Sequence, residues 1–489
     1  MLNGYGMACG CLWIWKSNLF LSKTLKGLLH LRRTGAAVFL LWALSLSCPV
    51  CRAGQVTVFT GARLIDGSGH PPIEDATLVI DGNRIVAVGK IDPSPYAAKS
   101  GAQVVRCDGE TIMPSLISDH SHLGVVKGEN ISSANYTPEN IKAALNQYEG
   151  YGVTAVLSLG MNKDLLYALR DGQRAGQFGG ADIFTADRGL GVATAAPPQP
   201  IGPDQVARPA TPEEARKIVR EMAARHPDII KCWVDDLFGT APKMPPEIYG
   251  AIIDEAHRNG LRVAAHLFYL EDAKSLLRDG LDVVAHSVRD KPVDQEFLDL
   301  MKTRHAAYIA TLALDESQFI YAEHPRWMDS AAFRAAVAPA LLGKWLSPQY
   351  AYRMRKNPMT PLNRSALAQG LQNVKSVHDA GVLVGFGTDS GAMPTRLPGW
   401  AEHRELQLLV QAGLTPMDAI VCATRNAAEV LGDGKNRGTL EPGKRADFLV
   451  LAASPLDDIR NTTRLVAIYH GGKRIEPAFH EPAPMAIGH

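Results

Sequence analysis

Between residues 114 and 436, apolar segments alternate with amphipathic ones, and this alternation constrains the fold more than any other feature of the chain. Eight apolar segments recur, among them "TAVLSLG", "DIIKCWVDD", "RVAAHLF" and "DVVAHSV", and stretches with helical spacing such as "PEIYGAIIDEAHRNG" separate most of them. Strands that are apolar without alternation are buried on both faces, and strand–helix alternation is typical of parallel pairing. Eight such units predict an α/β protein with a (β/α)8, or TIM, barrel over residues 114–436. A doubly wound open sheet is the alternative, but the glycine-rich phosphate loop expected after its first strand is missing.

The two ends of the chain have a different pattern. Residues 54–113 contain segments in which apolar and polar residues alternate, "QVTVFTGARLIDG", "ATLVIDGNRIVAVG" and "AQVVRCDGETIMP", and residues 437–489 contain similar ones, "ADFLVLAAS" and "LVAIYHGGKRI". Alternation with a period of two indicates strands with one buried face. Because both ends share this pattern, we expect a small composite β-sandwich built jointly from the N- and C-terminal segments.

Residues 1–53 are expected to be a leader and not part of the fold. They hold six basic residues and no acidic one, and the pair Arg32 and Arg33 precedes an apolar run from Ala36 to Ser47. That run is too short for a transmembrane helix, which needs about 20 apolar residues, and small residues follow it as in a secretory signal peptide. We therefore expect export, to the periplasm or out of the cell, and no stable membrane span. Anchoring by an uncleaved leader is the alternative.

Charge and cysteine content exclude several classes of protein. The chain has 51 Lys and Arg against 50 Asp and Glu, and six of the basic residues lie in the leader. The rest is therefore mildly acidic, which argues against a nucleic-acid-binding surface. Beyond the leader only Cys107, Cys232 and Cys422 remain, far apart in the sequence. They predict neither a disulfide framework nor a zinc–cysteine cluster, so stability has to come from the core.

Polar residues stand at the ends of several predicted strands, where the functional residues of a barrel collect. In "SDHSH" two histidines two positions apart point the same way from a strand. "DIIKCW" carries a lysine among apolar residues, two later strands carry one histidine each, and "GFGTDSG" contains an aspartate. The six residues are His120, His122, Lys231, His266, His286 and Asp389.

Each of these residues also has a structural interpretation on its own. A single histidine such as His266 or His286 is as often a core residue as a ligand, and Asp389 before Ser-Gly is suited to capping a helix. Lys231 is harder to explain, because an unpaired buried ammonium costs several kcal/mol. Since all six fall on one rim, we interpret them jointly as nitrogen and oxygen ligands of a site for two divalent metal ions.

The motifs around these residues resemble the amidohydrolase superfamily, nearest to its imidazolonepropionase-related and prolidase-like (Xaa-Pro dipeptidase-like) branch. "MPSLISDHSH" resembles the first-strand motif P-G-x-x-D-x-H-x-H of that family, with Ser115 where glycine is usual. "GLTPMDAIVCATRNAAEVLG" followed by "GTLEPGKRADFLVL" resembles its closing helices and their return to the sandwich. The resemblance covers residues 55–480 and implies a metal-dependent hydrolase with the barrel and sandwich described above.

The resemblance also implies a role for each ligand. It assigns His120 and His122 to the more buried ion, and His266 and His286 to the more exposed one. Asp389 would bind the buried ion and face the water between the two ions. The expected cofactors are thus two divalent metal ions, with Zn2+ as the first choice for a set of nitrogen and oxygen ligands.

Lys231 takes a special role in this resemblance, which implies that it is N-carboxylated and bridges both ions. Physical chemistry agrees with the assignment. A lysine beside two dications has to be neutral, and a carbamate supplies the negative charge that the ion pair needs.

The expected reaction is hydrolysis of an amide bond in a small molecule, with dipeptides, N-acyl amino acids and lactams as candidate substrates. Two metals lower the pKa of a bridging water, and Asp389 takes its proton and passes it to the leaving nitrogen. Tyr269, three residues after His266, is a candidate donor to the carbonyl oxygen, whereas the dipeptidase-like branch has tyrosine where this chain has Phe268. Arg188 is a candidate for binding a substrate carboxylate, or else a solvated loop residue.

Two other functions stay open at the level of sequence. One is a mononuclear-metal deaminase or imidazolone-type cyclic amide hydrolase with the same fold. Mononuclear branches of the family generally lack a lysine at the position of Lys231, which argues against this alternative. The other is a non-catalytic relative that serves as a binding protein, which the presence of all six candidate ligands makes remote. The sequence leaves the oligomeric state open, with a homo-oligomer among the options.

Overall fold

The computed structural model describes residues 55–193 and 195–481. The expected leader at residues 1–53 lies outside these ranges, so export and anchoring stay predictions. Within the described ranges, no helix is both long and apolar enough to cross a lipid bilayer.

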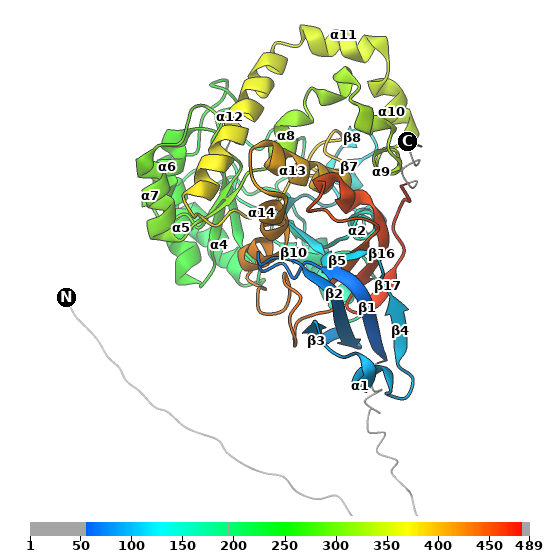
Figure 1. The fold of residues 1–489 in the computed structure, drawn as a ribbon. Helices are drawn as coiled ribbons and strands as arrows, with labels where there is room; N and C mark the ends of the chain where they lie inside the picture. The colour runs from blue at the N-terminus through cyan, green and yellow to red at the C-terminus, as the bar shows by residue number, and fades with distance from the viewer. Residues whose placement is uncertain (1–54, 194, 482–489) are drawn as a thin grey trace, which may run out of the picture. The chain divides into compact units, whose positions relative to one another are not determined.

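One mixed sheet joins the two ends of the chain (Figure 1). Its path runs β17–β16–β15–β5–β1–β2–β3, and β4 pairs in parallel with β1. Strand β15 from the C-terminal segment pairs antiparallel with β5 from the N-terminal segment, which places Phe448 opposite Pro114. The strands are β1 (Val56–Leu64), β2 (Ile73–Asp81), β3 (Arg84–Gly89), β4 (Gln103–Arg106), β5 (Thr111–Pro114), β15 (Phe448–Leu451), β16 (Leu465–His470) and β17 (Lys473–Ile475).

Aromatic packing in the core of this sheet connects residues from the two ends of the chain. The ring of Phe59 meets the rings of Phe448 and Tyr469 edge to face, at centroid distances of 5.1 and 4.9 Å. Phe448 and Tyr469 stack at 4.5 Å. Aromatic pairs in these geometries add to the stability gained from burial, so the core of the sheet depends on both ends of the chain.

Two parallel ladders form the central part of the chain, in the orders β10–β9–β6 and β11–β12–β13–β14. Every pairing within them is parallel, as the sequence pattern predicts. Isolated parallel bridges continue the pairing beyond the ladders, through the pairs Leu190–Cys232, Tyr308–Val384 and Ser121–Ser390. The strands are β6 (Leu116–Ser121), β9 (Val153–Ser158), β10 (Asp182–Thr185), β11 (Ile230–Trp233), β12 (Val263–His266), β13 (Val283–Ala285) and β14 (Ala307–Ile309).

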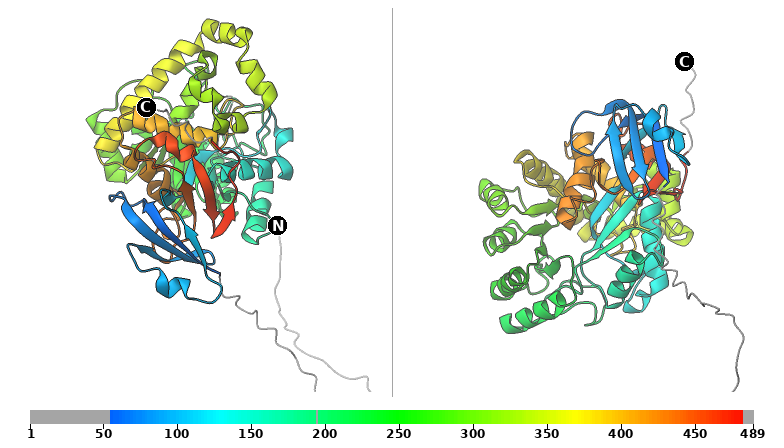
Figure 2. Two further views of the ribbon diagram at one scale, coloured as in Figure 1. Left: turned by 45° about the vertical axis from the view of Figure 1, so that its right-hand side comes forward. Right: turned by 90° about the horizontal axis from the view of Figure 1, so that it is seen from below.

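Helices follow most of these strands and lie on their outer side (Figure 2). In α4 (Pro212–Ala223), Thr211 caps the first turn by accepting a hydrogen bond from the backbone N–H of Glu214 at 3.2 Å, and proline begins the helix. Its buried residues recur at helical spacing, so one face packs inward: Ala215, Val219 and Met222. The others are α2 (Pro138–Gly150), α3 (Leu165–Arg174), α5 (Pro246–Arg258), α6 (Leu270–Arg278) and α7 (Gln295–Arg304).

The long connection between β14 and Val384 carries further helices, which extend beyond the ends of the parallel strands (Figure 1). These are α8 (Leu312–Glu316), α9 (Ala331–Ala336), α10 (Pro339–Trp345), α11 (Pro348–Lys356) and α12 (Met359–Asp379). Three helices lead back to the mixed sheet, α13 (Trp400–Gln411), α14 (Pro416–Val421) and α15 (Ala427–Leu431). The short elements include α1 (Ser94–Ala97), β7 (Val126–Lys127) and β8 (Asn130–Ile131).

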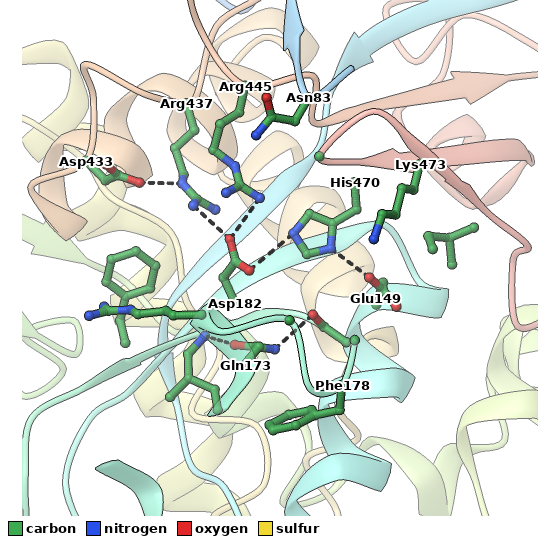
Figure 3. A pocket seen from close by; sticks show the side chains of 18 residues that line it. Asn83, Glu149, Gln173, Phe178, Asp182, Asp433, Arg437, Arg445, His470 and Lys473 are labelled. Carbon is green, nitrogen blue, oxygen red and sulfur yellow. Dashed lines mark hydrogen bonds and ion pairs between the residues drawn. The ribbon is translucent and has the colours of Figure 1, made fainter. Parts of the chain in front are cut away.

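A cluster of charged side chains connects the parallel strands with the mixed sheet. It lies in the wall of a cavity of about 690 Å³ (Figure 3). Asp182, the first residue of β10, accepts a hydrogen bond from Arg437 at 2.8 Å and lies 3.2 Å from Arg445. His470, the last residue of β16, lies 2.6 Å from Glu149 through Nδ1 and 3.4 Å from Asp182 through Nε2. Burial alone would lower the pKa of His470, but its bonds to Asp182 and Glu149 outweigh burial and raise the pKa to about 9.

Replacing His470 with glutamine is expected to lower the free energy of unfolding by about 2–3 kcal/mol at pH 6 and by much less at pH 10. The folded-state pKa of about 9 lies above the unfolded value, so the stabilisation is complete below the unfolded pKa and is lost as the pH rises through the folded one. Urea unfolding of both proteins at the two pH values measures this difference. A loss of stability that is the same at both pH values would contradict the charged state of His470.

Candidate metal centre

Two histidines and one aspartate meet at the end of β6. Every residue of β6 is buried, and His120 and His122 are only 1% and 3% exposed. Asp389 Oδ1 lies 3.3 Å from His120 Nε2 and 2.8 Å from His122 Nε2. One ligand atom from each of the three residues lies within 4.8 Å of the others. Two imidazoles and a carboxylate in this arrangement are suited to holding one divalent ion.

The second pair of histidines comes from the neighbouring strands β12 and β13. His266 is the last residue of β12, and His286 directly follows β13. Their ring centroids are 4.4 Å apart, and His286 lies 4.5 Å from His120 of the first pair. The structure therefore brings the four predicted imidazoles together in one contiguous group.

In His122 and His286, a residue outside the set of candidate ligands lies at hydrogen-bond distance from Nδ1. The Nδ1 atom of His122 lies 3.1 Å from the carbonyl oxygen of Gly160, and Nδ1 of His286 lies 2.7 Å from the Thr311 hydroxyl. Partners of this kind orient histidines that bind metals and decide which nitrogen faces the ion. Nε2 is thus the available ligand atom in both residues.

His266 is oriented the other way round. Its Nε2 lies 2.7 Å from Asp235 Oδ2, which leaves Nδ1 available. Burial lowers the pKa of His266, and it lowers the pKa values of His120 and His286 further. These rings are therefore neutral near pH 7, which is the form of imidazole that binds metal ions.

Lys231 on β11 is the group that this site otherwise leaves unexplained. Its side chain is fully buried, and its Nζ has no hydrogen-bond partner among the described residues. Burial lowers its pKa to about 7, although Asp389 acts in the opposite direction. Strand β11 pairs in parallel with β12, and Trp233, two residues after Lys231, is the register partner of His266. The Lys231 Nζ lies 5.4 Å from the centroid of the Trp233 ring. A buried amine without a hydrogen-bond partner and with a lowered pKa fits the expectation of a lysine that carries another group.

A buried carboxylate forms hydrogen bonds to the segments that carry these candidate ligands. Glu402 on α13 accepts hydrogen bonds from Ser118 at 3.0 Å, Thr388 at 2.7 Å and Ser390 at 2.8 Å. Ser118 lies on β6, and the other two residues flank Asp389. Glu402 therefore fixes the aspartate segment against the strand that carries the first histidine pair.

A cavity of about 550 Å³ is lined by His122, His266 and Asp389. Apolar side chains form much of its wall, namely Trp233, Phe238, Phe268, Leu314, Met354 and Met359. Two guanidinium groups, Arg289 and Arg396, are also in the wall. Tyr350 on α11 and Met359 on α12 show that the inserted helices cover this cavity. The site can thus enclose a small molecule with apolar groups.

The two remaining candidates from the sequence lie elsewhere. The Tyr269 hydroxyl donates a hydrogen bond to Asp236 at 2.9 Å, and Phe268 lines the cavity instead. Arg188 contacts the carbonyl oxygen of Pro203 at 3.5 Å and lies 3.7 Å from Asp187, and it is not part of the cavity wall. The roles of Tyr269 and Arg188 toward a substrate stay predictions.

Sequence reasoning missed four residues of this site, Asp235, Arg289, Arg396 and Glu402. Asp235 could have been predicted from the sequence, because it closely follows the strand that carries Lys231. Arg289 and Arg396 follow His286 and Asp389 by three and seven positions, but many surface arginines stand in similar loops. Glu402 is 284 positions from Ser118, and no local pattern predicts that contact.

Comparisons with known proteins show which proteins this chain is similar to. The chain is 27% identical to ochratoxinase from Aspergillus niger over 466 residues, covering 86% of each chain. It is 25% identical to imidazolonepropionase from Hyphomonas neptunium, covering 80% of this chain and 92% of that one. A putative prolidase from Bifidobacterium longum has the same fold, with a TM-score of 0.68 at 24% identity over 88% of this chain and 97% of that one.

The resemblance inferred from the motifs is therefore confirmed. The family model that matches residues 111–475 is that of the amidohydrolases, whose members depend on metal ions. The matched range includes both histidine pairs, Lys231 and Asp389. The protein belongs to the amidohydrolase family and is a hydrolase that acts on carbon–nitrogen bonds.

Proposed function

We propose that this protein is a binuclear amidohydrolase that cleaves the amide bond of a dipeptide, an N-acyl amino acid or a lactam. The observation that carries the proposal is Lys231. Its side chain is completely buried, it lies on the strand next to the one that carries His266, and its Nζ has no hydrogen-bond partner among the described residues. Burying such an amine costs free energy, which a bridging role between two ions would explain.

The donor set fits two ions. His120, His122 and Asp389 would hold one ion, and His266 and His286 the other. Lys231, N-carboxylated on its neutral amine, would serve both. Zn2+ suits this combination of imidazole nitrogens and carboxylate oxygens. When bound, such a pair of ions lowers the pKa of water and polarises a carbonyl group.

The chain itself supplies the proton transfer and the binding of the substrate. Asp389 accepts the proton of the attacking water and returns it to the leaving nitrogen. Its Oδ1 faces His120 and His122, whereas Oδ2 faces the cavity wall at Arg396. The apolar wall excludes water from the scissile bond, which strengthens the electrostatic interactions of Asp389. Tyr269 stays the proposed donor to the carbonyl oxygen.

We further propose that the parallel strands close into a (β/α)8 barrel and that the mixed sheet folds into a small sandwich. The bridges Tyr308–Val384 and Ser121–Ser390 support closure, because they extend both ladders to the same segment at residues 384–390. The leader at residues 1–53 is proposed to direct export.

Removing the metals tests the proposal. The holoenzyme is assayed on dipeptides, N-acyl amino acids, lactams and an aminopurine nucleoside, before and after dialysis against a chelator. Hydrolysis of an amide substrate is expected to fall by about 10²-fold or more on chelation and to return with Zn2+. Removing the metal ions should leave the fold in place, and circular dichroism checks this. Turnover of the nucleoside alone would favour the deaminase, and activity indifferent to chelation would refute the proposal.

A further inference from the structure

Arg396 is held at the cavity with part of its guanidinium group unused. Its side chain is only 12% exposed, and its Nη1 donates to Asp389 Oδ2. Its Nε is buried and has no partner among the described residues, and Nη2 makes no hydrogen bond to them either. The edge formed by Nε and Nη2 is therefore free.

The same edge is occupied in a neighbouring arginine of this protein. Arg404 binds Glu316 through Nε and Nη2, both at 2.7 Å. This two-donor geometry matches the two oxygens of a carboxylate and makes the pair stronger than a single hydrogen bond. Arg396 presents the equivalent edge without a carboxylate.

Among the described residues, no carboxylate of the cavity wall makes a hydrogen bond to that edge. Asp235 binds His266, and Asp315 binds Arg289 at 3.1 Å. Asp389 Oδ2 already accepts from Nη1 on the other side of Arg396, and Asp389 Oδ1 contacts the histidines. A buried cation with unused donors favours a ligand that brings its own negative charge.

We propose that the Nε–Nη2 edge of Arg396 binds a carboxylate of the substrate, next to the scissile amide. This inference rests on the proposed function and narrows its substrate class to N-acyl amino acids and dipeptides, at the expense of lactams and neutral amides. Phe268 and Leu314 in the same wall suit an apolar side chain beside that carboxylate.

A matched pair of amides tests the proposal. N-acetyl-L-phenylalanine and N-acetyl-2-phenylethylamine differ only in the carboxylate. With the zinc-loaded holoenzyme, kcat/KM for the acid is expected to exceed that for the neutral amide by about 10- to 100-fold. Equal values for the two amides would overturn the proposal while leaving amide hydrolysis intact.

Three variants separate recognition of the carboxylate from general damage. Because Arg396 also touches Asp389, the readout is the ratio of the two kcat/KM values. Arg396→Met is expected to bring that ratio close to one, and Arg396→Lys to restore part of it, because lysine keeps the charge but not the two-donor edge. Arg474→Met removes an exposed arginine of β17 and should leave the ratio unchanged. A ratio that survives in Arg396→Met would overturn the proposal.

Binding distinguishes a failure of the proposed function from a failure of this subsite. If neither amide is cleaved, hydrolysis of these substrates is refuted, and calorimetric dissociation constants of N-acetyl-L-phenylalanine then decide the subsite. Binding that is at least about tenfold tighter in the wild type than in Arg396→Met supports it. Equal dissociation constants would overturn it.

Discussion

Replacing Asp389 with asparagine is expected to lower kcat by about 10³-fold while the protein stays folded. Asparagine has nearly the same shape, and hydrogen bonds around Glu402 hold the segment that carries residue 389. It can neither accept the proton of the attacking water nor bring negative charge to His120 and His122. Steady-state kinetics on a cleaved amide measure the loss, and circular dichroism and thermal unfolding check the fold.

The matched control is Asp379→Asn. Asp379 is an exposed carboxylate at the end of α12 that pairs with Lys375, and its loss should leave kcat within about twofold. An Asp389→Asn enzyme that kept more than a tenth of the wild-type kcat would show that another group takes the proton. Equal losses in the two variants would point to a general effect on the fold.

Replacing Lys231 with methionine is expected to make the metal-free protein more stable and the enzyme inactive. Methionine fills a similar volume without a buried amine, so the free energy of unfolding of the metal-free protein should rise by about 2 kcal/mol. Activity should fall by about 10³-fold, because the variant has no amine to carboxylate. Urea unfolding after dialysis against a chelator measures stability, and kinetics in bicarbonate measure activity.

Lys274→Met provides the contrast. Lys274 is also buried, with its side chain 5% exposed, but its Nζ lies 2.5 Å from Asp294 and 3.1 Å from Glu296. Removing this paired lysine should destabilise the protein and leave kcat nearly unchanged. If Lys231→Met destabilised the metal-free protein as Lys274→Met does, Lys231 would have a structural partner and the bridging role would lose its main support.

The parallel strands, and the places of the six candidate ligands on or after them, could be predicted because each depends on local sequence. An uninterrupted apolar run predicts a strand buried on both faces, and a polar residue at its end is expected at the functional edge. His266 and His286 follow this rule on neighbouring strands, and the structure places their rings 4.4 Å apart. The spacing of His120 and His122 likewise determines that both point the same way.

Contacts between distant loops could not be predicted in this way. The position of Tyr269 illustrates the limit, because the turn after β12 directs Phe268 to the cavity and Tyr269 to Asp236. A sequence shows that an aromatic residue follows His266, but the direction of each side chain depends on the backbone of the turn. Arg396 and Glu402 depend in the same way on how the segment after Asp389 folds back.

The cluster around His470 is a second case. Asp182 and Arg437 are 255 positions apart, and Glu149 and His470 are 321 positions apart. The alternation of apolar residues predicts the strands that carry Asp182 and His470, but it contains no information about their partners. Such ion pairs form where the parallel strands meet the mixed sheet, and only the packing of the whole chain brings them together.

The central claim is that Lys231 bridges two metal ions, and the metal content per chain tests it most directly. Wild type and Lys231→Met are purified with Zn2+ in bicarbonate, and their metal content is measured by mass spectrometry of the ions. The account predicts about two ions per wild-type chain and a clear loss in the variant, as expected when a shared ligand is removed. One ion per chain in both proteins would contradict the bridge and leave Lys231 without the role proposed for it.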